Sequence, residues 1–231
     1  QGTIGLEILE QLDGKVDTIL CPIGGGGIIA GIAVAAKGIN PNIKIVGVQT
    51  ANIPSMQESM KNGEVTTAFK STTIADGIAV KTPGDVTFEI INELVDEVVV
   101  VEEDEIAQGM LFLMENQKVV AEGAGAVTTA ALLSGKYVPK KDENVVCVIS
   151  GGNVDVNTLY RVIGTALTKE ARRYSFNTVI QDKPGGLAEL TKIISEYDAN
   201  ILSANLSRSS MGGALGSLTA EMVLETFNHD H

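Results

Sequence analysis

Four consecutive glycines, Gly24 to Gly27, stand between an apolar run and a helix-like segment. Glycine costs about 0.5–1 kcal/mol relative to alanine inside regular structure, so a run of four indicates that something approaches the main chain closely. A strand, a glycine turn and a helix N-terminus together form an anion site, because free N–H groups point outward and the helix dipole adds positive charge. The sequence therefore predicts that this turn binds a phosphate group.

The residues around the turn leave three alternatives open. A triphosphate-binding loop needs a Lys-Ser/Thr pair at a fixed distance after the glycines, and this sequence has none. A dinucleotide site is better matched, since Gly25, Gly27 and Ala30 fit Gly-x-Gly-x-x-Ala. However, the acidic ribose anchor expected about 20 residues later is replaced by Gln49 and Thr50. The third alternative is close packing of a helix on a strand, with no ligand.

A second candidate for chemistry is Ser150, in the stretch "VVCVISGGN" at residues 145–153. It follows an apolar run, and open α/β sheets bind ligands at the carboxyl ends of their strands. A serine there can hydrogen-bond a ring nitrogen without forcing it to stay protonated. The alternative is an ordinary strand-to-helix turn, in which Asn153 or Asp155 caps the following helix.

The elements that must position these residues follow from the apolar pattern. Apolar runs with little alternation are typical of strands buried on both faces, and they cover residues 17–23, 43–50, 96–101 and 144–150. Apolar residues at helical spacing predict helices over residues 3–12, 28–37, 85–95, 104–118 and 157–172. Strands that alternate with helices predict an α/β fold, a mostly parallel sheet with helices on both faces.

The pattern changes after residue 172. Residues 174–181 alternate like a half-buried strand, "DKPGG" predicts a turn, and residues 187–197 form an amphipathic pattern. Two more strands are predicted within residues 199–210 and 216–227, around the glycine-rich "MGGALG". We therefore expect two domains, residues 1–172 and residues 173–231, the second being a small α+β domain.

The composition excludes several kinds of partner. A net charge of −12 disfavours nucleic acid and anionic lipid, and no apolar run approaches the roughly 18 residues that span a bilayer. Cys21 and Cys147 lie in separate apolar runs, which favours free buried thiols in a reducing cytoplasm over a disulfide. The only histidines are His229 and His231, so no metal site is expected. Because the chain starts with Gln1, we expect it to be part of a longer gene product.

Five motifs occur in a fixed order: "QGTIGLEI", "CPIGGGGIIAG", "TIADGIAV", "VAEGAGA" and "VISGGN". Over about residues 1–170 the sequence resembles the threonine ammonia-lyases (threonine dehydratases), which are fold-type II pyridoxal phosphate enzymes. The resemblance implies that Gly24, Gly25, Gly26 and Gly27 cradle the phosphate of pyridoxal 5'-phosphate. It implies that Ser150 bonds the pyridine nitrogen and that the Ala-Asp-Gly turn, with Gly77, passes its backbone beside the cofactor.

The resemblance also implies a reaction, the conversion of L-threonine to 2-oxobutanoate and ammonia, in which the cofactor acts as an electron sink. A neutral hydroxyl at Ser150 would temper that sink and suit elimination better than transamination. Serine dehydratase or serine racemase activity is the alternative within the family. An amino-acid-binding regulatory and assembly module without catalysis is the alternative from another class. We expect a cytoplasmic homo-oligomer with a small amino-acid substrate.

The sequence departs from the family in ways that carry their own expectations. The lysine that holds the cofactor lies upstream in the family, and Lys81 and Lys118 lack its sequence context and suit the surface. We therefore expect no catalytic residue in this chain, and no turnover by it alone. Relatives that bind a divalent cation place acidic residues where this chain has "VQTANIPSM", so no such metal is expected. For Glu122, a structural role and an active-site role are both open.

Residues 177–203 resemble the opening of an ACT domain, a small module that binds amino acids and regulates metabolic enzymes. The resemblance rests on the turn Asp-Lys-Pro-Gly-Gly-Leu and the later Ala-Asn-Ile. The resemblance implies effector contacts near Gly186, Leu187, Asn200 and Ile201, with a ligand carboxylate at the helix N-terminus. The last helix and strand of such a domain are missing from the sequence. Assembly without ligand binding is the alternative.

Overall fold

A four-stranded parallel sheet forms the centre of the first part of the chain in this computed structural model, which describes residues 1–69, 71–208 and 216–231. The strands are β1 (Thr18–Pro22), β2 (Lys44–Thr50), β3 (Glu97–Val101) and β4 (Val145–Cys147), in the spatial order β3-β2-β1-β4. Because all four run in the same direction, the loops that follow them reach the same edge of the sheet. The predicted α/β fold with a parallel sheet is confirmed.

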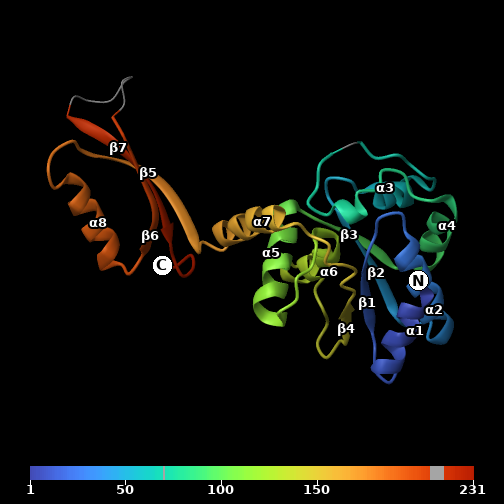
Figure 1. The fold of residues 1–231 in the computed structure, drawn as a ribbon. Coiled ribbons are helices and arrows are strands. Elements are labelled where there is room, and N and C mark those ends of the chain that lie inside the picture. Colours follow the sequence, from blue (N-terminus) through green and yellow to red (C-terminus); the bar gives the residue numbers. More distant parts are fainter. Residues whose placement is uncertain (70, 209–215) are drawn as a thin grey trace. The chain divides into compact units, whose positions relative to one another are not determined.

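Helices cover both faces of this sheet (Figure 1). One face packs against α1 (Gly2–Gln11), α2 (Gly27–Ile39) and α4 (Asp85–Leu94), in the core that contains Ile19, Ile29 and Ile91. On the other face lies α6 (Gly123–Leu133), which packs against β1, β2 and β3. Outside it lies α5 (Glu103–Phe112), which continues as the π-helical turn η2 (Leu113–Gln117). Two further short elements are α3 (Ser55–Asn62) and the 3-10 turn η1 (Asp76–Ile78).

The strands differ in burial more than their similar composition suggests. β1 is wholly buried, and β2 is buried from Ile45 to Thr50, whereas most of β3 and all of β4 are half-buried. The expectation of burial on both faces is therefore correct for the central strands and wrong for the outer two, each of which pairs with one strand among the described residues. Cys21 in β1 and Cys147 in β4 are both free, as predicted, and Cys147 is half-buried for the same reason. Burial raises the pKa of the Cys147 thiol to about 11.

The second part of the chain is a three-stranded antiparallel sheet with one helix on it. Strands β5 (Arg173–Gln181), β6 (Asn200–Ser207) and β7 (Ser217–Glu225) lie in the order β5-β7-β6. Helix α8 (Gly186–Glu196) packs over a small core of Ile194, Ala220, Met222 and Leu224. The two predicted strands beyond residue 199 are present, but residues 209–215, which include most of "MGGALG", lie outside the described residues.

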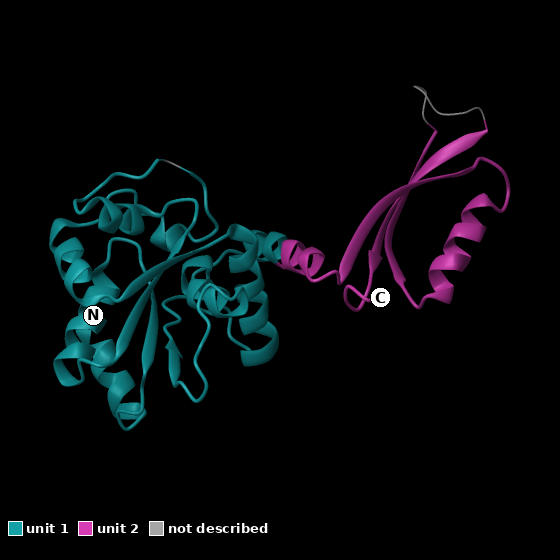
Figure 2. Ribbon diagram, turned by 180° about the vertical axis from the view of Figure 1, so that it is seen from behind, with its two compact units in different colours: residues 1–162 teal, residues 163–231 magenta. Residues whose placement is uncertain are grey.

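The chain divides into two compact units, residues 1–162 and residues 163–231 (Figure 2). The division falls inside helix α7 (Val156–Lys169), whereas the predicted boundary follows residue 172, near the end of that helix. Among the described helices, none combines the length and the apolar character that crossing a membrane requires.

Candidate functional site

The four glycines form a turn between the end of β1 and the start of α2, at the carboxyl edge of the parallel sheet. Gly26 is the N-cap of α2 and has a left-handed backbone with φ 93°. A side-chain carbon added at Gly25 would meet nothing within 4 Å, and one at Gly27 would meet only the Gln1 amide at 3.9 Å. Within the described residues, no acceptor takes a hydrogen bond from the N–H groups of residues 24–29. Open space beside free N–H groups at a helix N-terminus fits a phosphate group.

The other two glycines of the turn are required by packing. A side-chain carbon at Gly26 would lie 2.7 Å from Ile91 Cδ1 and 2.9 Å from Thr87 Cβ. One at Gly24 would lie 3.1 Å from Ile78 Cα. The hydroxyl of Thr87, in the first turn of α4, donates to the Gly25 carbonyl at 2.6 Å. Two positions of the turn therefore face open space, and two bring it against α4 and the Ala-Asp-Gly segment.

The Ala-Asp-Gly segment forms η1 directly beside the glycine turn, since the Gly77 carbonyl oxygen lies 3.5 Å from the side-chain position of Gly24. A carboxylate from another helix holds the backbone just before this segment. Glu103, in the first turn of α5, accepts hydrogen bonds from the Ile74 N–H at 2.7 Å and from the Thr50 hydroxyl at 3.0 Å. Residues 74–77 are thus held by the carboxyl ends of β2 and β3.

Glu122, in "VAEGAGA", joins this segment to the Ser-Gly-Gly-Asn loop. Its N–H donates to the Gly151 carbonyl at 3.1 Å, and its carboxylate accepts from the Asn153 N–H at 3.1 Å. Its Oε1 lies 3.3 Å from the side-chain position of Gly77. The sequence left the role of Glu122 open, and these contacts are those of a residue that braces two backbone turns.

Ser150 lies at the same edge of the sheet as the glycine turn. It is exposed and follows β4, which pairs in parallel with β1 so that Cys147 lies opposite Leu20. The Gly24 turn begins four residues after Leu20 and Ser150 comes three residues after Cys147, so adjacent parallel strands deliver both. The structure therefore groups the glycine turn, Gly77 and Ser150 on one edge, with Glu122 between the last two.

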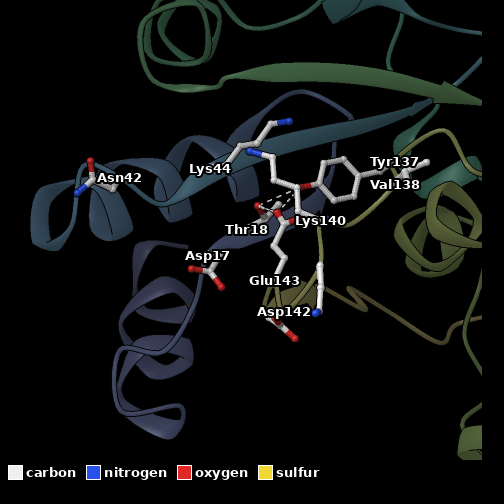
Figure 3. A pocket seen from close by; sticks show the side chains of 10 residues that line it. Asp17, Thr18, Asn42, Lys44, Tyr137, Val138, Lys140, Asp142 and Glu143 are labelled. Carbon is white, nitrogen blue, oxygen red and sulfur yellow. Dashed lines mark hydrogen bonds between the residues drawn. The ribbon is translucent and has the colours of Figure 1, made fainter.

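A cavity of about 370 Å³ lies at the opposite edge, where the strands begin (Figure 3). Several donors of its lining converge on one carboxylate: Glu143 accepts hydrogen bonds from the Thr18 hydroxyl, the Tyr137 hydroxyl and the Lys140 N–H. The Lys44 ammonium lies 4.9 Å from the centre of the Tyr137 ring. The bonds from Thr18 and Tyr137 lower the pKa of Glu143 to about 2, and burial raises the pKa of Tyr137. We interpret this cluster as a clamp between β1 and the loop before β4.

The predicted effector residues do not converge in the second unit. Gly186 and Leu187 begin α8, whereas Asn200 and Ile201 begin β6, beyond the other end of that helix. A helix of 11 residues is about 16 Å long, so the two pairs lie far apart. Asn200 donates to Glu225 at 3.1 Å, and Ile201 packs against the small core. An effector site at these residues stays a prediction, and within one copy it would consist of two separate regions.

Comparison with known proteins relates the first unit to one family. The family of pyridoxal-phosphate dependent enzymes matches residues 1–151. An L-threonine ammonia-lyase of Thermotoga maritima is 48% identical over all 231 residues, which make up 57% of that protein. Among solved structures, maize serine racemase has a TM-score of 0.65 and 37% identity, covering 74% of this chain and 52% of that one. The processed form of threonine deaminase isoform 2 from Solanum lycopersicum has a TM-score of 0.66 and 36% identity, covering 71% and 48%.

Proposed function

The chain belongs to the family of pyridoxal-phosphate dependent enzymes, and from this premise we propose that it is part of an enzyme that converts L-threonine to 2-oxobutanoate and ammonia. The chain spans 57% of the length of its Thermotoga relative, so the activity belongs to the whole protein. The identity of 48% to an L-threonine ammonia-lyase, maintained over the entire chain, supports threonine as the substrate.

One observation carries the proposal. Gly25 and Gly27 leave open space beside the free N–H groups that begin α2, and the neighbouring parallel strand brings Ser150 to the same edge. We propose that residues 24–27 hold the phosphate of the cofactor and that Ser150 hydrogen-bonds its ring nitrogen. Bound pyridoxal phosphate supplies an electron sink for the removal of the α-proton and the β-hydroxyl of the substrate.

The residues of this chain have positioning roles in that chemistry. The glycine turn would hold the phosphate through its free N–H groups and the dipole of α2. Ser150 supplies a neutral hydroxyl, which leaves the ring nitrogen free to lose its proton. Glu122 and Glu103 keep the backbone on either side in place. Ser150→Asp should therefore shift the whole protein from elimination towards transamination, and an unchanged product ratio would count against this role.

The activity test uses the whole protein loaded with cofactor. L-Threonine should yield 2-oxobutanoate and ammonia in equal amounts, and Ser150→Ala should reduce this rate. Serine racemase activity is a second candidate, because a serine racemase is among the similar structures, at 37% identity. L-Serine should then yield D-serine, which chiral chromatography separates from the remaining L-serine. Formation of D-serine without 2-oxobutanoate from threonine would replace the proposal by this alternative.

We propose further that the lysine which holds the cofactor in this family is not in this chain. Lys81 and Lys118 are exposed, and Lys118 bonds the Glu115 carbonyl at 2.6 Å. The 231 residues alone should then show no turnover of threonine, and measurable turnover would contradict this.

For residues 173–231 we propose an ACT-like regulatory domain attached to a catalytic portion in residues 1–172. The support is the order of elements, strand, helix, strand, strand, in a sheet of order β5-β7-β6. An amino acid that regulates the enzyme should bind here, and calorimetric titration of the whole protein with individual amino acids tests it. Gly186→Val should abolish any heat of binding, because α8 begins at this position and a side chain there would meet the Gln181 carbonyl.

A further inference from the structure

Gln49 is the last but one residue of β2, and its side chain is completely buried. Burying an amide costs free energy unless both of its ends are hydrogen-bonded. Here both ends are bonded. The side-chain oxygen accepts from the N–H groups of Met56 and Gln57, each at 3.0 Å. The side-chain nitrogen donates to the Ile23 carbonyl at 3.4 Å.

The partners of this amide belong to two elements that are distant in sequence. Met56 and Gln57 are in the first turn of α3, whose N-cap is Pro54 and makes no side-chain capping bond. Gln49 therefore does for α3 what an N-cap side chain does elsewhere, at a distance of seven residues. Its other partner, Ile23, directly precedes Gly24.

The two ends of the amide have different requirements. The end that faces two N–H groups must be an acceptor, and the end that faces a carbonyl must be a donor, which fixes the orientation of the amide. Glutamate would keep the acceptor and lose the donor, and methionine would lose both. Asparagine carries the same amide with a donor end and an acceptor end, but it is shorter by one methylene.

We infer that Gln49 is a positioning residue, whose buried amide ties the carbonyl before the glycine turn to the start of α3 and so fixes the turn at the edge of the sheet. Gln49 bonds the carbonyl of Ile23, just before Gly24, and Thr87 bonds the carbonyl of Gly25, just after it. The two side chains thus hold the backbone on both sides of the first glycine. The sequence flanks the turn with apolar residues that cannot provide this link. The link to phosphate binding rests on the proposed function, whereas the link to the order of the turn does not.

The test uses the full 231-residue chain and measures backbone order parameters by NMR. In the wild type, residues 24–27 should have values near 0.85, typical of rigid backbone. Gln49→Met should lower them towards 0.6 and should expose the Met56 and Gln57 amides to hydrogen exchange. Gln49→Glu should lower them as well but leave those two amides protected. This separation of the two ends is not expected if Gln49 only fills space.

A matched control comes from Gln57, whose side-chain nitrogen donates to the Val98 carbonyl at 2.9 Å without contacting the turn. Gln57→Glu and Gln57→Met should leave the order parameters of residues 24–27 unchanged. In the whole protein, the affinity for pyridoxal phosphate should fall about tenfold in Gln49→Met, the loss expected for one hydrogen bond, and should be unchanged in Gln57→Met.

Unchanged order parameters in Gln49→Met would overturn the inference. If this variant does not fold, the wild type decides: the side-chain amide protons of Gln49 should exchange more slowly than those of Gln57, and equal rates would overturn it. Failure of the whole protein to bind pyridoxal phosphate, together with the expected order parameters in the 231-residue chain, would count against the proposed function and leave the role of Gln49 standing.

Discussion

Gly25 and Gly26 are neighbours in the same turn, and the structure predicts opposite results for the same substitution. Gly26→Ala forces a side chain onto a backbone with φ 93° and against Ile91, so it should cost about 1–3 kcal/mol of unfolding free energy. Gly25→Ala enters open space and should change the unfolding free energy by no more than about 0.5 kcal/mol. Urea unfolding of the two variants measures this difference.

Gly25→Ala, which should hardly change the unfolding free energy, should weaken the binding of the cofactor phosphate. Its new methyl group occupies the space beside the free N–H groups, so the affinity for pyridoxal phosphate should fall although the fold is intact. Titration of the cofactor below the unfolding temperature measures this loss. Gly38→Ala is a useful control, because Gly38 also faces open space without a left-handed backbone but lies near the C-terminal end of α2, away from the glycine turn. If Gly25→Ala bound the cofactor as the wild type does, the turn would not be its phosphate site.

At the residue level, the sequence identified the glycine turn because a run of four glycines is a local signal. It also identified Gln49 and Thr50, but only as residues that fail to provide a carboxylate for a ribose. The structure shows why both are polar: Gln49 bonds Ile23 and α3, and Thr50 donates to Glu103. These partners are distant in sequence, so no spacing rule could reveal them.

At the scale of elements, the cluster around Glu143 joins the start of β1 to the loop before β4, and it should make stability depend on pH. The folded-state pKa of Glu143 is lowered to about 2. A group with a depressed pKa contributes stability above its unfolded pKa and loses it as the pH falls towards the folded value. The difference in unfolding free energy between wild type and Glu143→Gln should therefore shrink between about pH 5 and pH 2.

Urea unfolding at a series of pH values measures this effect. The exposed Glu10→Gln is the matched control, since Glu10 lies in α1 and its side chain makes no described hydrogen bond. Tyr137→Phe should cost about 1 kcal/mol near neutral pH through loss of the bond to Glu143. A constant difference between wild type and Glu143→Gln over this pH range would contradict the clamp.

Two helices were not predicted, for different physical reasons. In α3 the sequence "SMQESMKN" is largely polar, its buried residues include Ser55 and Ser59, and its N-terminus is capped by Gln49 from another element. In α6 the sequence "GAGAVTTAALL" is rich in small residues, and all residues from Gly123 to Ala131 are buried, so it has no amphipathic period. Gly123 and Gly125 allow close contact with the Ile74 and Gly151 backbones, a reason for glycine that local pattern cannot express.

At the scale of the whole molecule, the change of pattern after residue 172 indicated two domains, and the chain does form two compact units. The division lies ten residues earlier, between Val162 and Ile163. The sequence did not reveal it, because α7 continues through this point without a change in its apolar period. A helix that belongs to both units shows no break in its apolar pattern. The sequence can therefore indicate a domain boundary only where the helix ends.

Each unit has its own hydrophobic core, and we predict that core substitutions act on one unit only. Met222 of β7 is fully buried in the core under α8, and Ile29 of α2 is fully buried in the core that also contains Ile19 of β1. Replacing either by alanine should cost about 2–5 kcal/mol in its own unit. The smaller unit has few buried apolar residues, so Met222→Ala should leave it largely unfolded at ambient temperature.

Hydrogen exchange with peptide resolution measures both effects, at residues 217–225 for β7 and at residues 18–22 for β1. Met222→Ala should speed exchange in β7 alone and Ile29→Ala in β1 alone; if either variant speeds exchange in both strands, the cores are energetically one.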